Sequence, residues 1–221
     1  MSIPAVAEII VAVFGSLLVL WILTLLPARR AFAGQPAVPA PPTVPRSHNP
    51  RSFAAAVGTL AVFIVNILTL GLFVVAAFNP EARPFVETLR TPLPREAHWA
   101  GALLFAGYGI WGWLVLAFNP GYTPFFRKRT GAIVLAVRGP YAIIRHPRYA
   151  AEAALNVILF LFTGSWTSLL GVLAWPLIRR QAIREEEFLL GAAPETYGRY
   201  MAVTGRFLPR WKFRKADRPA A

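Results

Sequence analysis

Residues 53–78 read FAAAVGTLAVFIVNILTLGLFVVAAF and contain no charged side chain. A helix that crosses a bilayer needs about 20 consecutive, largely apolar residues, and this stretch exceeds that length. The whole chain has the same character, because 56% of its 221 residues are hydrophobic and 15% are charged. An ordinary soluble domain carries about 25% charged residues. The sequence therefore predicts a membrane protein with a transmembrane helix at 53–78.

Three further apolar stretches extend this prediction. Residues 3–26 and 97–118 are each long enough for one span. Residues 149–178 are too long for a single span, and the tripeptide Thr-Gly-Ser at 163–165 interrupts them near the middle, which indicates a tight helical hairpin. The expected fold is therefore an all-α, polytopic membrane helix bundle with about five transmembrane helices, the last two forming the hairpin.

The first apolar stretch, 3–26, resembles a permanent helix more than a cleaved signal peptide. Its apolar run is longer than the core of a signal, no Lys or Arg precedes it, and Arg29 and Arg30 follow it. We therefore expect this segment to remain in the protein as the first span.

The basic residues indicate how the spans are oriented. The chain has 23 Lys and Arg against 10 Asp and Glu, a net charge of +13. Twenty of the 23 fall in the segments 27–52, 119–148 and 179–221, which five spans place on one side. Because Lys and Arg accumulate on the cytoplasmic side, we expect the amino terminus outside and the carboxyl terminus in the cytoplasm. The same distribution argues against a nucleic-acid partner, since the charges follow the topology rather than one helix face.

Composition excludes several kinds of site. The chain has no Cys, which excludes disulfides, thiolate nucleophiles and Cys-bound metals. Its His residues, His48, His98 and His146, lie far apart in sequence, and we expect no metal centre. Residues 35–50 are rich in proline and predict an extended linker, whereas we expect the basic tail 212–221 to be disordered. No internal repeat supports an inverted-repeat transporter.

Residues 138–152, RGPYAIIRHPRYAAE, lie at the expected cytoplasmic surface just before the hairpin. Pro140 and Pro147 restrict the residues before them to extended conformations. We therefore expect Gly139 and His146 in a bent, non-helical segment that can direct side chains at a ligand. Two interpretations stay open from this stretch alone, because His146 either belongs to a binding site or contacts lipid headgroups at the membrane surface.

Residues 179–190, RRQAIREEEFLL, continue from the fifth expected span. Four of the ten acidic residues fall within eleven positions from here on: Glu185, Glu186, Glu187 and Glu195. Desolvating an unpaired carboxylate at the mouth of an apolar bundle is costly, and a functional cluster is one interpretation of this grouping. The alternative is a solvated charged helix, in which Arg180 and Arg184 neutralise the carboxylates at close to i, i+4 spacing.

The two stretches together resemble a known family. GPYAIIRHPRY, the apolar hairpin, REEEFLL, ETYGRY and GRFLP occur in the order and spacing of the isoprenylcysteine carboxyl methyltransferase family of integral membrane methyltransferases, which has phospholipid methyltransferase relatives. The resemblance covers residues 131–211, the expected cofactor-binding core, and extends to 1–130 only as hydrophobic spans. It implies S-adenosylmethionine as cofactor, an amphiphilic methyl acceptor and a cytoplasmic carboxyl-terminal helical segment.

The resemblance also implies the site residues. In the family, the His and Tyr of the RHPxY element and the Glu pair after the hairpin bind the cofactor, while an Arg and the first Glu hold the acceptor. The implied catalytic residues are Arg180 and Glu185. The implied cofactor-binding residues are Tyr141, His146, Pro147, Tyr149, Ala151, Glu186, Tyr197, Tyr200, Leu208 and Pro209. The aromatic end of the motif, with Phe207 beside the last two, is expected to fold over the cofactor.

The chain departs from the family pattern at three places. Ala151 stands where the family usually has Gly, which adds a Cβ where backbone approaches the cofactor. Ala193-Pro194 replaces a Phe-Gly pair, and Arg148 lies inside the RHPxY element where a small or apolar residue is common. These departures bear on the cofactor geometry and on the acceptor.

The chemistry of methyl transfer fits such residues. The reaction is an in-line displacement from a sulfonium cation, so the protein has mainly to align and desolvate donor and acceptor. A carboxylate acceptor needs an orienting cation but no general base, and Arg180 or Arg184 can supply the charge. An amphiphile enters between helices, while the polar cofactor enters from the cytoplasm.

Two other classes of protein stay open. Membrane sterol and steroid reductases have a similar HPxYxG element and hairpin but use NADPH, and Glu152 is a feature expected of them. A non-enzymatic membrane scaffold or small transporter is the second alternative. The abundance of Ala, Arg, Pro and Gly indicates a bacterial source and hence the bacterial cytoplasmic membrane, where the acceptor is a lipid, an isoprenoid or a small amphiphile. The sequence does not specify the oligomeric state.

Overall fold

The computed structural model of the chain describes residues 2–31, 37–38, 53–119 and 133–210. The long helices are α1 (Ile3–Ala31), α2 (Phe53–Phe78), α4 (Arg95–Ala117), α6 (Pro147–Thr163) and α7 (Trp175–Ala192). The short helices are η1 (Pro80–Ala82), α3 (Arg83–Thr88), α5 (Pro140–Ile143), η2 (Trp166–Ala174) and α8 (Pro194–Val203). The expected all-α class is therefore correct for the described residues, which add only a pair of two-residue strands, β1 (Ala37–Val38) and β2 (Ile133–Val134).

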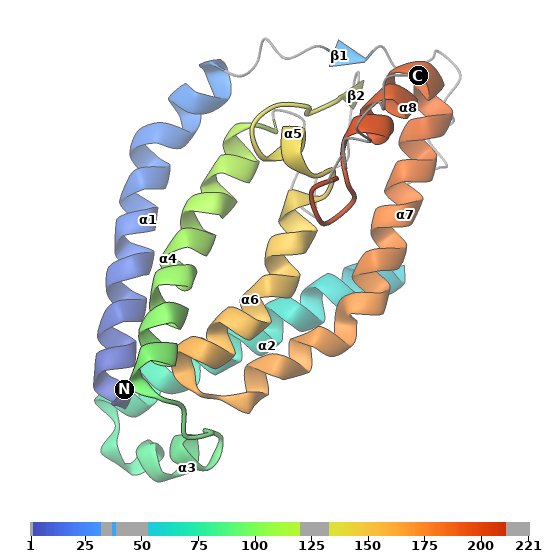
Figure 1. The fold of residues 1–221 in the computed structure, drawn as a ribbon. Helices are drawn as coiled ribbons and strands as arrows, with labels where there is room; N and C mark the ends of the chain where they lie inside the picture. Colours follow the sequence, from blue (N-terminus) through green and yellow to red (C-terminus); the bar gives the residue numbers. More distant parts are fainter. Residues whose placement is uncertain (1, 32–36, 39–52, 120–132, 211–221) are drawn as a thin grey trace, which may run out of the picture.

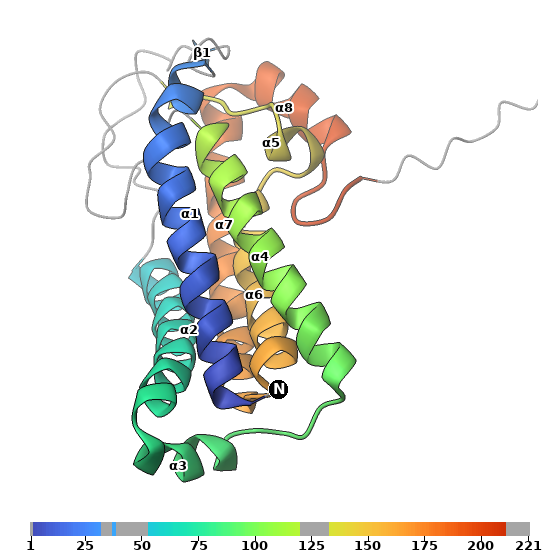
Figure 2. The same cartoon turned by 90° about the vertical axis from the view of Figure 1, so that its left-hand side faces the viewer.

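The long helices stand side by side and run in alternating directions (Figure 1 and Figure 2). The amino terminus, α3 and the turn between α6 and η2 lie at one end of the bundle. The strands, α5 and α8 lie at the opposite end. Chain segments that are far apart in sequence, before α6 and after α7, are thus brought to the same end.

Two of the described helices, Val57–Phe78 and Arg95–Ala117, are long and apolar enough to cross a membrane, judged by length and composition. The described part of α1 contributes the shorter apolar segment Ala5–Ser16. The expected span 53–78 coincides with α2, and 97–118 is shifted by one or two residues from α4. Helix α1 extends beyond the expected 3–26.

The turn expected at 163–165 is present. Helix α6 ends at Thr163, and Gly164 takes the left-handed conformation with φ 75° while its N–H donates to the carbonyl of Phe160 at 2.8 Å. Glycine adopts this conformation without the steric cost that a Cβ brings. The returning arm differs from a regular helix, because it begins as the 3-10 helix η2 of nine residues. Its Gly171 lies so close to Asn156 of α6 that a Cβ would overlap the Asn156 side chain.

The turn is held by the first turn of α4 and by the segment that precedes it. The carbonyl of Phe162 accepts a hydrogen bond from His98 Nδ1 at 2.8 Å, and the carbonyl of Thr163 accepts one from Arg90 Nε at 2.9 Å. The carbonyl of Gly164 accepts one from the N–H of Thr91 at 2.8 Å. Carbonyls at a helix end have no partner within the helix, so these donors satisfy groups that would otherwise be buried without one.

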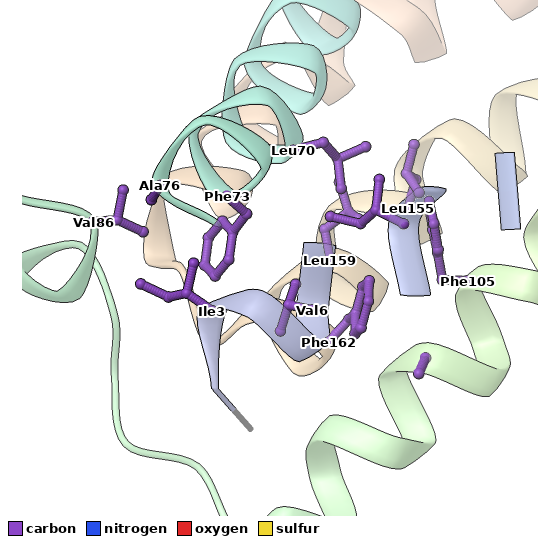
Figure 3. Packing of buried hydrophobic residues seen from close by; sticks show 12 residues of the cluster. Ile3, Val6, Leu70, Phe73, Ala76, Val86, Phe105, Leu155, Leu159 and Phe162 are labelled. Carbon is purple, nitrogen blue, oxygen red and sulfur yellow. The ribbon is translucent and has the colours of Figure 1, made fainter. Parts of the chain in front are cut away.

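A hydrophobic cluster fills the bundle at this end (Figure 3). It joins α1, α2, α3, α4 and α6, and Phe105 stacks on Phe162 with ring centroids 5.5 Å apart. Gly101 of α4 lies against the backbone of Phe162, where any Cβ would overlap it, so α4 and α6 approach closely. Small residues at such crossings let helices pack through dispersion contacts.

The structure describes only two residues of the expected linker and none of the expected tail. Within 35–50, Ala37 and Val38 form β1, which pairs antiparallel with β2 so that Ala37 lies opposite Val134. The rest of the linker and the whole tail 212–221 lie outside the described residues.

Candidate functional site

The segment that leads into α6 begins with an unusual glycine. Gly139 has φ 57° and ψ −130°, and a Cβ there would meet the ring of Phe118 at 2.6 Å. The sequence predicted an extended residue before Pro140, whereas this positive φ is open essentially to glycine alone. The short helix α5 then follows, at the same end of the bundle as the strands and α8.

His146 caps α6 and is not in mid-helix, as expected. It has φ −121° and ψ 61°, and Pro147 takes the first helical position, where its missing N–H is not needed. The indole Nε1 of Trp111 donates to the carbonyl of Pro147 at 3.1 Å, which fixes this turn to α4. The His146 side chain is buried, with 8% of its surface exposed, which disfavours a simple contact with lipid headgroups.

The end of the described chain returns to this segment. We call residues 204–209 the C-terminal strap. The N–H of Arg145 donates to the carbonyl of Gly205 at 2.8 Å, and the N–H of His146 donates to the carbonyl of Arg206 at 3.0 Å. Ile144 and Gly205 form a parallel bridge. The strap is thereby fixed beside the start of α6, as the red segment of Figure 1 shows.

Glu186 of α7 contacts both the start of α6 and the C-terminal strap and is almost fully buried. Its Oε1 accepts a hydrogen bond from Arg145 Nε at 2.9 Å, and its Oε2 accepts hydrogen bonds from Arg206 at 3.0 and 2.7 Å. His146 Nε2 lies 3.2 Å from Oε1, although the angles do not make this contact a hydrogen bond. Burial alone raises the pKa of the carboxyl, but the contacts with His146, Arg206 and Arg145 outweigh it and hold the pKa well below its usual range.

Glu185 is the more accessible of the two carboxylates. Its Oε1 accepts hydrogen bonds from the Tyr149 hydroxyl at 2.8 Å and from Gln181 Nε2 at 2.9 Å. Its Oε2 lies 3.8 Å from His146 Nδ1, beyond hydrogen-bond distance. The Glu185 side chain is 24% exposed, against 4% for that of Glu186.

Aromatic rings cover one side of the pair. His146 stacks on Tyr149 at 5.5 Å with an interplanar angle of 18°, and Phe207 of the strap lies 5.9 Å from His146. Trp175, at the start of α7, lies 4.7 Å from Phe207. Such rings offer faces to an organic cation or a flat ring system.

The structure brings most of the residues implied by the family resemblance to this end of the bundle. Tyr197 is fully buried, and burial followed by the charge of Glu186 raises its pKa. The Tyr200 hydroxyl donates to the carbonyl of Tyr141 at 2.6 Å. Ala151, the residue in place of the family Gly, is half-buried one turn into α6.

Three of the implied residues are exposed on the surface of the protein. Leu208 is 77% exposed and Pro209 is also exposed, so these two do not fold over the site. Arg180 is exposed on α7 and forms no ion pair with another described residue. Gln181, which the sequence did not single out, lies one turn before Glu185 and binds it instead.

Arg148 has a structural explanation. Its Nε donates to Glu152 Oε1 at 2.8 Å, one turn further along α6. The second oxygen of Glu152 is buried, and no hydrogen-bond donor among the described residues reaches it. Arg148 thus neutralises a carboxylate that the interior of the bundle would otherwise leave unpaired.

The sequence did not identify the two cations that hold Glu186. Arg145 was only part of the stretch RGPYAIIRHPRYAAE, and Arg206 was only part of the motif GRFLP. These two Arg residues reach Glu186 because the backbone of 144–146 pairs with that of 205–206. No local sequence pattern predicts this pairing between distant segments. Trp175 was missed for the same reason, since it is one apolar residue within an apolar arm.

Comparisons with known proteins add no family to these observations. No protein-family model matches the chain, and no curated protein matches it significantly. Within the described ranges, no group of three or more His, Asp or Glu side chains is arranged to hold a metal ion. The site is therefore defined by the contacts of this chain itself.

Proposed function

We propose that the protein is an integral membrane methyltransferase that uses S-adenosylmethionine and acts on an amphiphilic acceptor. One observation carries the proposal. His146 and Tyr149, at the start of α6, lie against Glu185 and Glu186 of α7 at one end of an apolar helix bundle. These are the two stretches that the family resemblance joins, and their side chains are in contact.

We propose five spans for the membrane part, formed by α1, α2, α4, α6 and η2 with the start of α7. Their alternating directions leave the site at the end of the bundle where α8 and the C-terminal strap lie (Figure 1). The sequence predicts that the segments with most Lys and Arg lie on this side of the membrane, so we propose that it is the cytoplasmic side. Large apolar side chains on the outer surfaces support contact with lipid. Examples are Leu60, Phe63, Leu68, Leu103 and Leu173.

The residues at the site fit the cofactor by their chemistry. S-adenosylmethionine carries a sulfonium, an ammonium and ribose hydroxyls, and when bound it supplies a methyl group activated by the positive sulfur. Among the described residues, the hydrogen-bond donors to Glu185 reach Oε1 rather than Oε2, while His146, Tyr149 and Phe207 offer ring faces. A carboxylate and aromatic faces both favour a cation. The surrounding apolar bundle limits the access of water, which strengthens these interactions.

The acceptor is held, on this proposal, at the membrane side of the site. The resemblance implies Arg180 and Glu185 for this role. Arg180 is exposed on α7 and lies five residues before Glu185, about 7.5 Å along the helix axis. A polar headgroup at the membrane surface can reach its guanidinium from the lipid. Acceptor classes that fit are carboxylates like that of isoprenylcysteine, lipid headgroups and isoprenoids.

The proposal is tested with purified protein in detergent micelles or nanodiscs. Isothermal titration should show binding of S-adenosylmethionine and none of NADPH, and membranes that contain the protein should accumulate a methylated product on incubation with the cofactor. Binding of NADPH alone would support the reductase alternative. Binding of neither would support a non-enzymatic membrane protein.

The role of Arg180 has its own test. Replacing Arg180 with Ala should suppress turnover while the affinity for S-adenosylmethionine stays nearly unchanged, because the cation is proposed to act on the acceptor. The matched control is Arg199→Ala, since Arg199 is also exposed but lies on α8. A loss of cofactor affinity in the Arg180 variant would contradict this assignment.

A further inference from the structure

We propose that the two adjacent carboxylates have different roles: Glu186 is an internal anchor that Arg145 and Arg206 hold, and Glu185 is the carboxylate that meets the cofactor. The part that concerns Glu185 rests on the proposed function. The part that concerns the anchor does not, because it is a statement about contacts within the chain. Arg145 and Arg206 are then positioning residues of the site.

The contacts of Glu186 leave it little to offer a ligand. Guanidinium groups donate to both of its oxygens, Arg145 to one and Arg206 to the other, and its side chain is 4% exposed. A cation that entered the site would have to displace a charged hydrogen bond to reach either oxygen. Such buried pairs are costly to break, because the partner left behind is a desolvated charge.

Arg145 joins the anchor to the end of α8. Its guanidinium also donates to the carbonyls of Met201 and Thr204, which lie in the last turn of α8 and directly after it. Carbonyls at a helix end carry partial negative charge and favour a cation there. Glu186 therefore keeps this cation in place from one side, and the end of α8 does so from the other.

Arg206 joins the anchor to the C-terminal strap. Its side chain binds Glu186, while its carbonyl accepts the hydrogen bond from the N–H of His146. The same residue thus fixes both α7 and the start of α6. The His146 ring is oriented by this arrangement, since Nε2 faces Glu186 and Nδ1 faces Glu185.

Glu185 has the opposite character. Its two hydrogen bonds, from Tyr149 and Gln181, both go to Oε1 and orient the group. Its Oε2 accepts neither of these hydrogen bonds and lies beside the His146 ring, which stacks on Tyr149, and the Glu185 side chain is partly exposed. A fixed carboxylate with one accessible oxygen is suited to an ammonium or a hydroxyl of the cofactor. This division differs from the family resemblance, which implies Glu186 for the cofactor and Glu185 for the acceptor.

The first experiment compares three variants of the triple Glu run: Glu185→Gln, Glu186→Gln and, as control, the exposed Glu187→Gln. Two quantities are measured, the affinity for S-adenosylmethionine by titration and the melting temperature without ligand. The Glu185 variant should bind about tenfold or more weakly with an unchanged melting temperature. The Glu186 variant should melt lower by on the order of 10 °C. The control should change neither quantity.

The second experiment keeps the anchor testable if the Glu186 variant does not fold. Arg206→Ala should lower the melting temperature, Arg206→Lys should restore part of the loss, and the control Arg199→Ala should have no effect. Where both single variants fold, combining Arg206→Ala with Glu186→Gln should cost less than the sum of the two. Additive losses, or an Arg206 variant as stable as the unmodified protein, would overturn the proposal that Arg206 holds Glu186 as an internal anchor.

The failures are distinguishable. If the unmodified protein does not bind S-adenosylmethionine, the proposed function fails and the role of Glu185 fails with it. The melting temperatures still decide whether Glu186 is an internal anchor. If the unmodified protein binds and the Glu186 variant loses the cofactor at an unchanged melting temperature, the proposed function stands and the division of roles is wrong.

Discussion

The Tyr149 hydroxyl donates a hydrogen bond to Glu185 Oε1 across 2.8 Å. It thereby joins the first turn of α6 to the second half of α7, two elements that lie on opposite arms of the hairpin. Gln181 shares the same oxygen, so the Glu185 carboxylate is oriented from both arms. The orientation of this group depends on the relative position of the arms and is not a property of α7 alone.

Replacing Tyr149 with Phe should weaken the binding of S-adenosylmethionine. The change keeps the ring that stacks on His146 and removes only the hydroxyl. Hydrogen bonds to charged groups contribute about 1.5–3 kcal/mol, so we expect a loss of about tenfold in affinity, measured by titration. Tyr108→Phe on α4 is the matched control and should bind normally. Equal affinity in both variants would remove Tyr149 from the ligand site.

The dependence of stability on pH should report Glu186. Its pKa in the folded protein is lowered, and the groups that face it are Arg145, His146, Arg206 and Tyr197. A carboxyl with a lowered folded pKa contributes fully above its unfolded pKa of about 4.3, and the contribution falls as the pH drops toward the folded value. The difference in melting temperature between the unmodified protein and Glu186→Gln should therefore be constant near neutrality and shrink below about pH 4. A difference that grows on acidification would contradict this.

Replacing Gly139 with Ala should destabilise the protein. The positive φ is unfavourable for any residue with a Cβ, and this Cβ would also overlap the Phe118 ring. We expect a loss of about 1–3 kcal/mol, measured by thermal or chemical unfolding. Gly191→Ala is the control, because it is a helical position of α7 with open space around it. That variant should be as stable as the unmodified protein or slightly more stable.

The proposed topology is open to labelling, since the chain has no Cys of its own. Glu81 lies before α3 and Glu195 lies in α8, at opposite ends of the bundle, and both are exposed. In intact cells, a membrane-impermeant maleimide should label the Glu81→Cys variant at once and the Glu195→Cys variant only after permeabilisation. Labelling of both variants in intact cells would refute the five-span arrangement.

The sequence predicts the helices well because their signal is local. The run at 53–78 gives the bounds of α2 directly, and the Gly164 turn divides the hairpin at the expected position. It does not predict that η2 is a 3-10 helix, because the choice between two helical geometries depends on packing against α2 and α6 rather than on the apolar pattern.

The candidate site is predicted in its residue types and only partly in its contacts. The expected meeting of His146 with Glu186 is present, at 3.2 Å. The role of Arg206 is not visible in the sequence, because it depends on a backbone pairing between distant segments. The exposure of Leu208 differs from the expectation that it folds over the site, whereas the neighbouring Phe207 ring lies against His146.

The three charged groups Arg145, Glu186 and Arg206 come from chain segments that are synthesised one after another. Glu186 follows Arg145 by 41 residues, and Arg206 follows Glu186 by 20. At about 5–20 residues per second, Arg145 is made about 2–8 s before its carboxylate, and Arg206 completes the group about 1–4 s later. All the long helices have been synthesised by then. A chain that ended before Thr204 would thus contain all the long helices but lack Arg206, and Glu186 would keep only one of its two guanidinium partners.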